Sequence, residues 1–214
     1  MSHGKGFPSR KLLIAAVAVA ALTLGAVASF LTSRPVAPKI DGLLWPQSKA
    51  LGELALEDHH RKAFTLERMT GRWTLLFFGY THCPDVCPVT LSVLKNAIAL
   101  MAEADTGAEP PQVVFVSVDP ARDNLAHLGA YVGHFSPEFL GVTGSDADLM
   151  AFARQLGVLY VRADSHTGGD YLVDHTAAVF LIDPRAHLVA LFQAPHVAKT
   201  LARDIPQIQG LEWN

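Results

Sequence analysis

The 214-residue chain has only two cysteines, Cys83 and Cys87, and this scarcity narrows its chemistry. Without a second cysteine pair the sequence cannot form a four-cysteine zinc site, and three residues separate the thiols where a dithiol redox motif has two. The absence of a cysteine near the N-terminus excludes a lipid anchor there. The purpose of the two thiols must be inferred from the residues around them.

Charge is also scarce, because charged residues make up 17% of the chain. The 17 Lys+Arg and 20 Asp+Glu give a formal net charge of -3. A surface that binds a polyanion needs a basic excess, so this balance argues against nucleic acid as a partner. The sequence has no internal repeat and no low-complexity tract, and half of its residues are apolar.

One long apolar segment is present, at residues 12–31. Its 20 residues carry no charge, and as a helix they could cross about 30 Å of hydrocarbon. Lys5, Arg10 and Lys11 precede it, and the more basic flank of such a segment normally stays in the cytoplasm. We therefore predict a cytoplasmic N-terminus at 1–11, a transmembrane anchor at 12–31 and an exported remainder.

A cleaved signal peptide is the alternative, because Ala26-Val27-Ala28 has the small-residue form of a cleavage site. The apolar core of such peptides is about 7 to 15 residues long, so the greater length here favours an uncleaved anchor. The basic stretch before the segment is too short for a mitochondrial transit peptide. We therefore expect a bacterial inner-membrane protein with one span and its C-terminal domain in the periplasm.

After a proline-bearing linker at 32–40, residues 41–214 are enough for one domain with its own core. Its apolar patterns alternate between the periods of strands and helices, which predicts an α/β fold with a central mixed sheet flanked by helices. The predicted strands are 73–79, 113–118, 139–142, 158–161, 176–182 and 188–192. The predicted helices are 89–103, 124–135, one from Ser145 and one from Pro195.

The stretch HCPDVCP places Cys83 at the end of a predicted strand and Cys87 in the first turn of a predicted helix. Backbone N–H groups and the helix dipole lower the pKa of a thiol in such a place. Residues four apart on a helix have Cβ atoms about 5 to 6 Å apart, whereas a relaxed disulfide needs about 3.5 to 4.5 Å. Two sulfurs on one metal ion lie roughly 4 Å apart, so the spacing suits a shared ion at least as well as a disulfide. Two thiolates favour Cu(I) or zinc.

A third ligand would come from the ten histidines. His175 is the best candidate, since it stands at the entrance to a predicted buried strand where the sheet edge can meet the cysteine loop. A lone histidine is more often a surface residue than a ligand, so these residues alone leave the question open. The histidines set aside precede the membrane segment, lie in charged or polar stretches, or adjoin Cys83 and should point away from its ion: His3, His59, His60, His127, His134 and His82.

Four motifs together resemble the Sco/SenC family of copper chaperones, which have a thioredoxin-like fold. They occur in the family's order, and the N-terminal anchor also fits. Asp119, in the second motif, is expected to shape the loop after its strand. The motifs are FGYTHCPDVCP at 78–88, FVSVDPARD at 115–123, FLGVTG at 139–144 and YLVDHTA at 171–177.

The resemblance implies that Cys83, Cys87 and His175 bind one copper ion, as Cu(I) with three ligands and as Cu(II) with an additional one. It also implies supporting positions around the ion for Asp85, between the cysteines, and for Asp174, which would help to orient the histidine. A soft ligand set of low coordination number would hold Cu(I) and still admit an incoming ligand.

The implied function is that of a membrane-tethered copper chaperone. It would assist assembly of the binuclear copper centre of cytochrome c oxidase subunit II, take its copper from a donor chaperone, and meet other copper-oxidase assembly factors. The resemblance implies a carrier rather than an enzyme, although an auxiliary thiol-disulfide reductase activity is compatible with it.

Three other functions stay open. In an exported thiol-disulfide oxidoreductase or peroxidase, Cys83 and Cys87 would form a redox-active disulfide. A structural zinc site would need a carboxylate or water as its fourth ligand. A tethered thioredoxin-like domain without activity is the remaining alternative.

Overall fold

The structure is a computed structural model that describes residues 10–32, 40–104, 107–163, 171–211 and 213. The chain divides into two compact units, Met1–Pro38 and Lys39–Asn214. Residues 1–9 of the predicted cytoplasmic segment and 33–39 of the predicted linker lie outside the described residues.

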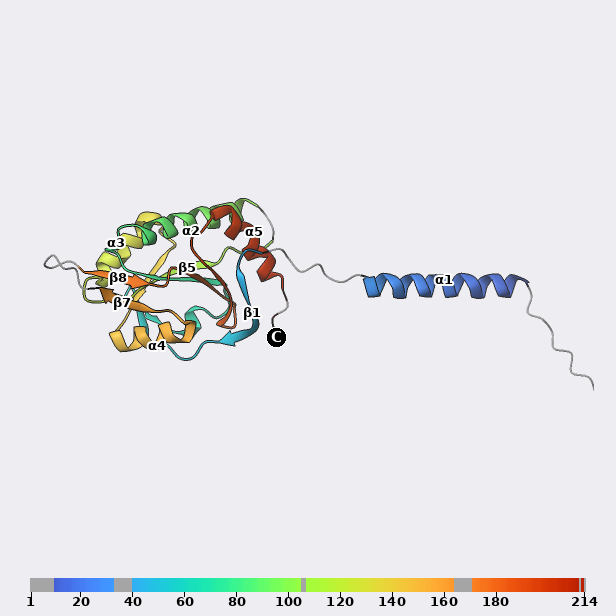
Figure 1. Cartoon of the computed structure of the whole chain (residues 1–214), viewed down its shortest axis with the longest axis horizontal. Coiled ribbons are helices and arrows are strands. Elements are labelled where there is room, and N and C mark those ends of the chain that lie inside the picture. The colour runs from blue at the N-terminus through green and yellow to red at the C-terminus, as the bar shows by residue number, and fades with distance from the viewer. Residues whose placement is uncertain (1–9, 33–39, 105–106, 164–170, 212, 214) are drawn as a thin grey trace, which may run out of the picture. The chain divides into compact units, whose positions relative to one another are not determined.

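The first unit contains one helix, α1 (Arg10–Thr32; Figure 1). By length and composition its window Arg10–Val27 could cross a membrane, and the side chains in that window are exposed. The helix α2 (Val86–Glu103) also passes this test, but it belongs to the second unit, where it packs against the helix α5 (Ala198–Gln209). Of the two candidate spans among the described residues, α2 is therefore a core helix of the second unit, and α1 belongs to the first unit.

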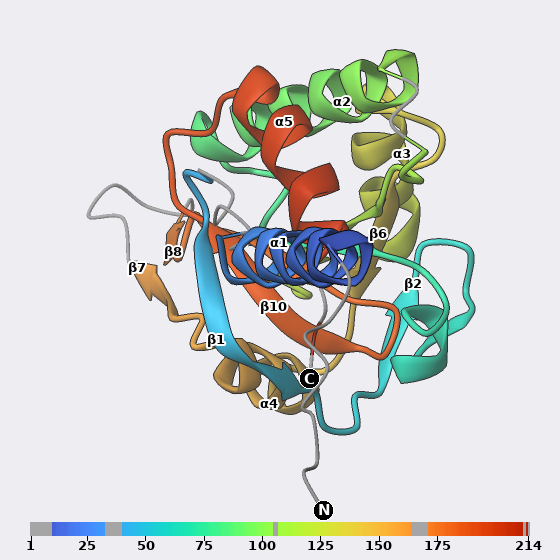
Figure 2. The same cartoon turned by 90° about the vertical axis from the view of Figure 1, so that its right-hand side faces the viewer.

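The second unit is built on a mixed eight-stranded sheet. Its strands are β1 (Leu43–Ala50), β2 (Leu56–Asp58), β3 (Ala63–Phe64), β4 (Thr74–Gly79), β5 (Gln112–Ser117), β6 (Leu140–Thr143), β9 (Val179–Ile182) and β10 (His187–Phe192). Their order is β1-β10-β9-β4-β5-β6-β2-β3. The strands β4, β5 and β6 are parallel, and the other neighbours pair antiparallel. Figure 2 shows β10 beside β1 at one edge.

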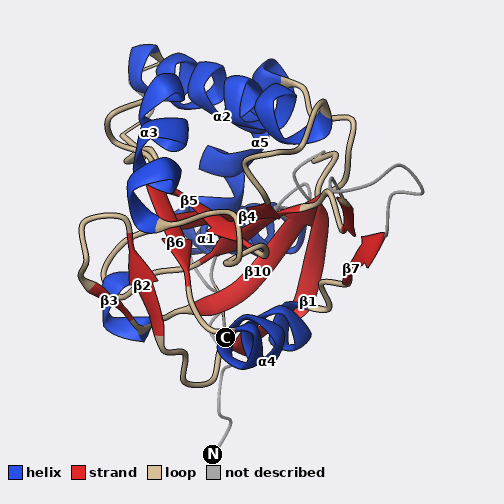
Figure 3. Ribbon diagram, turned by 90° about the vertical axis from the view of Figure 1, so that its left-hand side faces the viewer, coloured by secondary structure: helices blue, strands red, loops and turns tan. Residues whose placement is uncertain are grey.

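The central strands are buried because helices cover both faces of the sheet. All residues of β4 and β9 are buried, as expected for a strand that reads as a continuous apolar run. In Figure 3 the helices α2, α5 and α3 (Leu125–Phe135) cover one face, and α4 (Asp146–Leu156) covers the other. The predicted α/β fold with a mixed sheet flanked by helices is confirmed.

Local sequence signals explain where the helices begin. The side chain of Asn124 accepts a hydrogen bond from the backbone N–H of His127 at the start of α3. Ser145 accepts one from Asp148 in the same way at the start of α4, as the capping-box pattern predicts. Gly157 ends α4 with a φ of 71°, which suits a residue without a Cβ.

Some predicted strands and helices differ from the observed ones. A separate two-stranded sheet pairs β7 (Tyr160–Ala163) with β8 (Leu172–His175), so the strand expected at 158–161 does not join the main sheet. The strand expected from 176 begins only at Val179, and the last helix begins at Ala198 instead of Pro195. The strands β1, β2 and β3 were not predicted, because they are short or too polar to show an apolar pattern.

Gly79, the last residue of β4, leaves room for a cysteine. A Cβ at this position would lie 2.6 Å from Cys87 Sγ and 2.7 Å from Phe115 Cε2. We expect Gly79→Ala to displace Cys87 and to lower the free energy of unfolding by about 1 to 3 kcal/mol, the usual cost of overpacking a core. Chemical denaturation of the full chain measures this change.

Gly133→Ala is the matched control, because Gly133 lies inside α3 and its Cβ would have no neighbour within 4 Å. This replacement should be neutral or stabilise the protein by about 0.5 to 1 kcal/mol. Equal effects of the two replacements would contradict the close contact between Gly79 and Cys87.

Candidate metal centre

Cys83 and Cys87 lie on either side of the start of α2. Cys83 belongs to the loop that follows β4, and its N–H donates to Tyr80 O at 3.3 Å. Cys87 is the second residue of α2 and is fully buried. Its backbone N–H donates to Cys83 Sγ at 3.4 Å, and the two thiols are not bonded to each other. The first turn of α2 therefore presents to the Cys83 sulfur an N–H that has no partner within the helix, as the sequence predicted.

His175 reaches the two cysteines from the other sheet. It is the last residue of β8, not the entrance to a strand of the main sheet, and its Nε2 lies 3.3 Å from Cys87 Sγ. Its Nδ1 lies 3.2 Å from Thr176 O, and the rings of Phe77 and Tyr80 pack edge-on at centroid distances of 6.0 Å. The backbone carbonyl and the two rings thus hold the imidazole with Nε2 toward the sulfurs.

The donor atoms of Cys83, Cys87 and His175 all lie within 4.8 Å of one another. Two sulfurs and one imidazole nitrogen at such separations fit a single soft or borderline ion with modest side-chain movement. Among the described residues, this is the one group of three or more His, Cys, Asp and Glu side chains that converges so closely. The three residues predicted as ligands are therefore brought together.

The pKa values of the two thiols are shifted in opposite directions. A hydrogen bond from the Cys87 thiol, together with those from His175 and from backbone N–H groups, lowers the pKa of Cys83 to about 3 against the effect of burial. Its bond to Cys83 and its own burial raise the pKa of Cys87. The Cys83 sulfur is thus a thiolate at neutral pH, and Cys87 carries the proton that a metal ion must displace.

The two predicted supporting carboxylates do not contact the cluster through their side chains. Asp85 is exposed at the N-terminal cap of α2 without a side-chain capping bond, and only its backbone interacts with Cys83. Asp174 is exposed and pairs with Val161 across the β7–β8 sheet. Since the polar atom beside His175 Nδ1 is a backbone carbonyl, the roles of Asp85 and Asp174 stay predictions.

Asp119, together with Arg122 and Tyr171, anchors the start of β8, which the sequence did not indicate. Asp119 is fully buried and accepts hydrogen bonds from Arg122 Nε and from the hydroxyl of Tyr171. Arg122 Nη1 donates to Tyr171 O at 2.9 Å, and its guanidinium carbon lies 3.6 Å from the centroid of the Tyr171 ring. These contacts tie the loop after β5 to the strand that ends in His175. Asp119 therefore shapes its loop, as predicted, and also fixes this strand.

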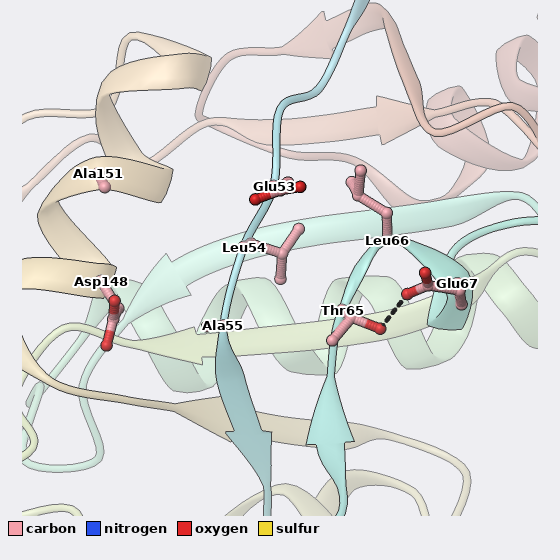
Figure 4. A pocket seen from close by; sticks show the side chains of 8 residues that line it. All are labelled: Glu53, Leu54, Ala55, Thr65, Leu66, Glu67, Asp148 and Ala151. Carbon is pink, nitrogen blue, oxygen red and sulfur yellow. Dashed lines mark hydrogen bonds between the residues drawn. The ribbon is translucent and has the colours of Figure 1, made fainter.

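A well-formed pocket elsewhere in the domain is distinct from the cysteine cluster (Figure 4). It lies between the chain before β2, the segment after β3 and the helix α4. Thr65 donates a hydrogen bond to Glu67 at its edge. The pocket contains three carboxylates but neither cysteine nor histidine, so it offers no soft ligand. Its lining residues are Glu53, Leu54, Ala55, Thr65, Leu66, Glu67, Asp148 and Ala151.

Comparison with known proteins gives a consistent result. The SCO1/SenC family model matches residues 46–209. A protein of Stutzerimonas stutzeri that is named for copper binding is 37% identical over 78% of this chain and 80% of its own length. The crystal structure of Arabidopsis thaliana ScoI with copper bound has a TM-score of 0.69 at 34% identity, covering 73% of this chain and 96% of that one.

A mitochondrial relative is longer than this chain. The human protein SCO2 homolog is 38% identical over 133 residues, which are 62% of this chain and 50% of that protein. The chain thus spans about half the length of this relative.

The unequal protonation of the two thiols can be measured by alkylation. Between pH 5 and pH 8 we expect Cys83 of the reduced protein to react with iodoacetamide at a nearly constant rate, because it remains a thiolate above its pKa of about 3. Mass spectrometry identifies the modified cysteine. An ordinary thiol, with a pKa of about 8.5, would slow about tenfold for each pH unit below that value.

Replacements of Cys87 test the cause of the low pKa. Cys87→Ser keeps a hydrogen-bond donor beside Cys83 and should preserve most of its reactivity at pH 5. Cys87→Ala removes the donor and should lower that reactivity. A thiol that titrates near pH 8.5 in all three proteins would contradict the account.

Proposed function

Because this chain belongs to the SCO1/SenC family, we propose that it is a metallochaperone that carries one copper ion on Cys83, Cys87 and His175. The observation that carries this proposal is the convergence of the three donor atoms within 4.8 Å. The copper-bound structures of relatives support copper over other soft ions. Copper is the cargo of such a protein, so binding and release matter equally.

The donor set suits both oxidation states of copper. Two thiolates favour Cu(I), and an imidazole with room for one further ligand makes Cu(II) tolerable. His175 is half-buried and Cys83 is buried with 9% of its surface accessible, whereas Cys87 is fully buried. An acceptor can therefore approach the ion from the side of Cys83 and His175 and replace one ligand at a time, without releasing free copper.

We further propose that the copper reaches cytochrome c oxidase subunit II, as the family resemblance implies. An apolar helix such as α1 would keep the domain close to membrane-embedded oxidase subunits. The basic residues before the apolar segment 12–31 favour a domain on the periplasmic side of a bacterial inner membrane.

A thiol-disulfide oxidoreductase is the second candidate function, and the lowered pKa of Cys83 favours it. An attacking thiolate at Cys83 with a protonated thiol at Cys87 is the arrangement that such an enzyme uses. Cys87 contributes more than His175 to the lowered pKa of Cys83, so the thiolate and its exchange chemistry should persist at neutral pH without the histidine. The histidine therefore separates the two functions.

Anaerobic titration of the reduced full chain in detergent tests the copper proposal. We expect one Cu(I) per chain, with the affinity lowered about tenfold or more by each of Cys83→Ala, Cys87→Ala and His175→Ala, since each removes a ligand. His134→Ala is the control, because this exposed histidine on α3 lies outside the cluster and should leave the affinity unchanged.

His175→Ala should also abolish the sulfur-to-copper absorption of the Cu(II) form while leaving the rate of thiol-disulfide exchange intact. Unchanged copper affinity in this variant, or stoichiometric zinc without copper in protein from copper-replete cells, would contradict the proposal.

Transfer to a partner can be measured directly. Copper-loaded full chain mixed with the reduced soluble domain of oxidase subunit II should lose its copper to that domain. A second experiment supplies the subunit with oxidised cysteines. If these cysteines become reduced while copper moves in neither experiment, the oxidoreductase function is favoured.

A C-terminal β-lactamase fusion tests the proposed topology. It should confer ampicillin resistance and remain in the membrane fraction after a carbonate wash. A resistant but soluble fusion would indicate a cleaved signal peptide, and a sensitive strain with a stable fusion would indicate a cytoplasmic domain.

A further inference from the structure

Two histidines that the proposed copper site does not use lie side by side at the cysteine loop. The ring centroids of His82 and His127 are 5.4 Å apart, and their planes meet at 76°. His82 directly precedes Cys83, and His127 lies in the first turn of α3. Both residues are exposed. Sequence reasoning set His82 aside because it adjoins Cys83, and His127 because it lies in a polar stretch; their separation of 45 positions gave no sign that they meet.

A buried carboxylate lies beside the His82 ring and is joined to it through the Thr81 hydroxyl. Asp123 is fully buried, and its Oδ1 lies 3.6 Å from His82 Nδ1. The same carboxylate accepts hydrogen bonds from the backbone N–H of Thr81 at 2.9 Å and from Ser117 Oγ at 2.6 Å, which fix its position. Thr81 Oγ1 also lies 3.1 Å from Nδ1. Because Thr81 Oγ1 donates its own proton to Asp123 Oδ1 at 2.6 Å, it accepts a hydrogen bond from Nδ1–H of His82, and this tautomer leaves a lone pair on Nε2 for a metal ion.

The backbone of His127 is held by a hydrogen bond, whereas its imidazole nitrogens are available to a ligand. Its N–H donates to Asn124 Oδ1 at 2.9 Å, which holds the first turn of α3. Among the described residues, neither nitrogen of the His127 imidazole has a hydrogen-bond partner. The ring can therefore turn about χ2 and offer a nitrogen to an ion beside His82.

The distance between the rings fits a shared ion. With a metal–nitrogen bond of about 2.0 Å and a ring nitrogen about 1.2 Å from the centroid, two imidazoles on one ion have centroids about 4.5 Å apart at the 90° angle of tetragonal Cu(II) and about 5.2 Å apart at a tetrahedral angle. The observed separation is 5.4 Å. A shared Cu(II) thus needs the two exposed rings to close by roughly 1 Å or less from their observed positions. His59 and His60, the other adjacent pair, are only 3.9 Å apart, and His59 Nδ1 accepts a hydrogen bond from Gly141 N. The His59 and His60 rings are therefore too close together to share an ion, and one nitrogen of His59 already has a hydrogen-bond partner.

We propose that His82 and His127 form a second metal site that binds one Cu(II), with water completing the coordination. Neutral imidazoles suit Cu(II), and copper stands highest in affinity among the divalent ions of the first transition row. If the proposed copper site is also correct, this second site would hold copper at the edge of the loop before Cys83 receives it.

The site is tested in a full-chain variant in which Cys83, Cys87 and His175 are replaced by Ala, so that the result does not depend on the first site. His3 is also replaced by Ala, because a histidine near the N-terminus can bind Cu(II) through backbone nitrogens. One equivalent of Cu(II) is added as a glycine complex. Equilibrium dialysis measures affinity, and electron paramagnetic resonance counts the coupled imidazole nitrogens.

We expect one bound Cu(II) per chain with two coupled imidazole nitrogens. His127→Ala and His82→Ala should each lower the affinity about tenfold or more, because each removes a ligand. His134→Ala, two turns further along α3, and His60→Ala should have no effect. Absence of binding in the parent variant, or binding that survives either replacement at the proposed site, would overturn the proposal.

A kinetic measurement tests the link to the first site. In the chain with all three proposed copper ligands, His127→Ala should slow Cu(II) loading while leaving the final stoichiometry at Cys83, Cys87 and His175 unchanged. An unchanged loading rate would contradict transfer of copper from the second site to the first, but it would not affect the binding measured by dialysis. A chain that loads no copper on these three residues would instead contradict the proposed function.

Discussion

The contact on which the site depends is the 3.3 Å approach of His175 Nε2 to Cys87 Sγ, which joins segments 88 positions apart. Further contacts hold both Cys87 and His175 in position. Gly79 admits the Cys87 sulfur against the end of β4, while Asp119, Arg122 and Tyr171 secure the strand that carries the histidine. The rigid main sheet thus sets the position of the sulfurs, and a two-stranded sheet secured by these side chains presents the imidazole.

The two thiols differ in protonation, and this difference sets the order in which they can bind a metal ion. Cys83 is already a thiolate beside the first turn of α2, so it can meet an arriving cation without losing a proton. Cys87 must lose its proton as the ion settles, which makes tight binding dependent on pH. His175 is half-buried and Cys83 keeps 9% of its surface accessible, so a partner can reach the site from their side, whereas Cys87 lies in the core. Uptake and release are thereby expected at the same edge of the site.

Sequence patterns predicted most of what local forces determine. The apolar runs of β4 and β5 and the Ser145 cap are signals within a few residues, and the structure has them where expected. A strand was expected at 158–161, but β8 and its pairing with β7 in a separate sheet were missed, because exposed Val161 and Leu172 give these strands no regular apolar alternation. The contacts of Tyr171 with Asp119 and Arg122 span 52 and 49 positions, so no spacing rule could indicate them. The hairpin turn after Asp183 holds Ala186 at a φ of 60°, where glycine is common, and the Asp183 carboxylate accepts bonds from the N–H groups of Arg185 and His187.

X-ray absorption spectroscopy of the Cu(I)-loaded full chain tests the central claim most directly, because it counts the atoms bound to copper. The account predicts two sulfurs and one imidazole nitrogen around a single copper, with the nitrogen absent in His175→Ala and present in His134→Ala. A copper bound by sulfur alone in the unmodified chain, or a nitrogen that persists after His175 is replaced, would contradict it.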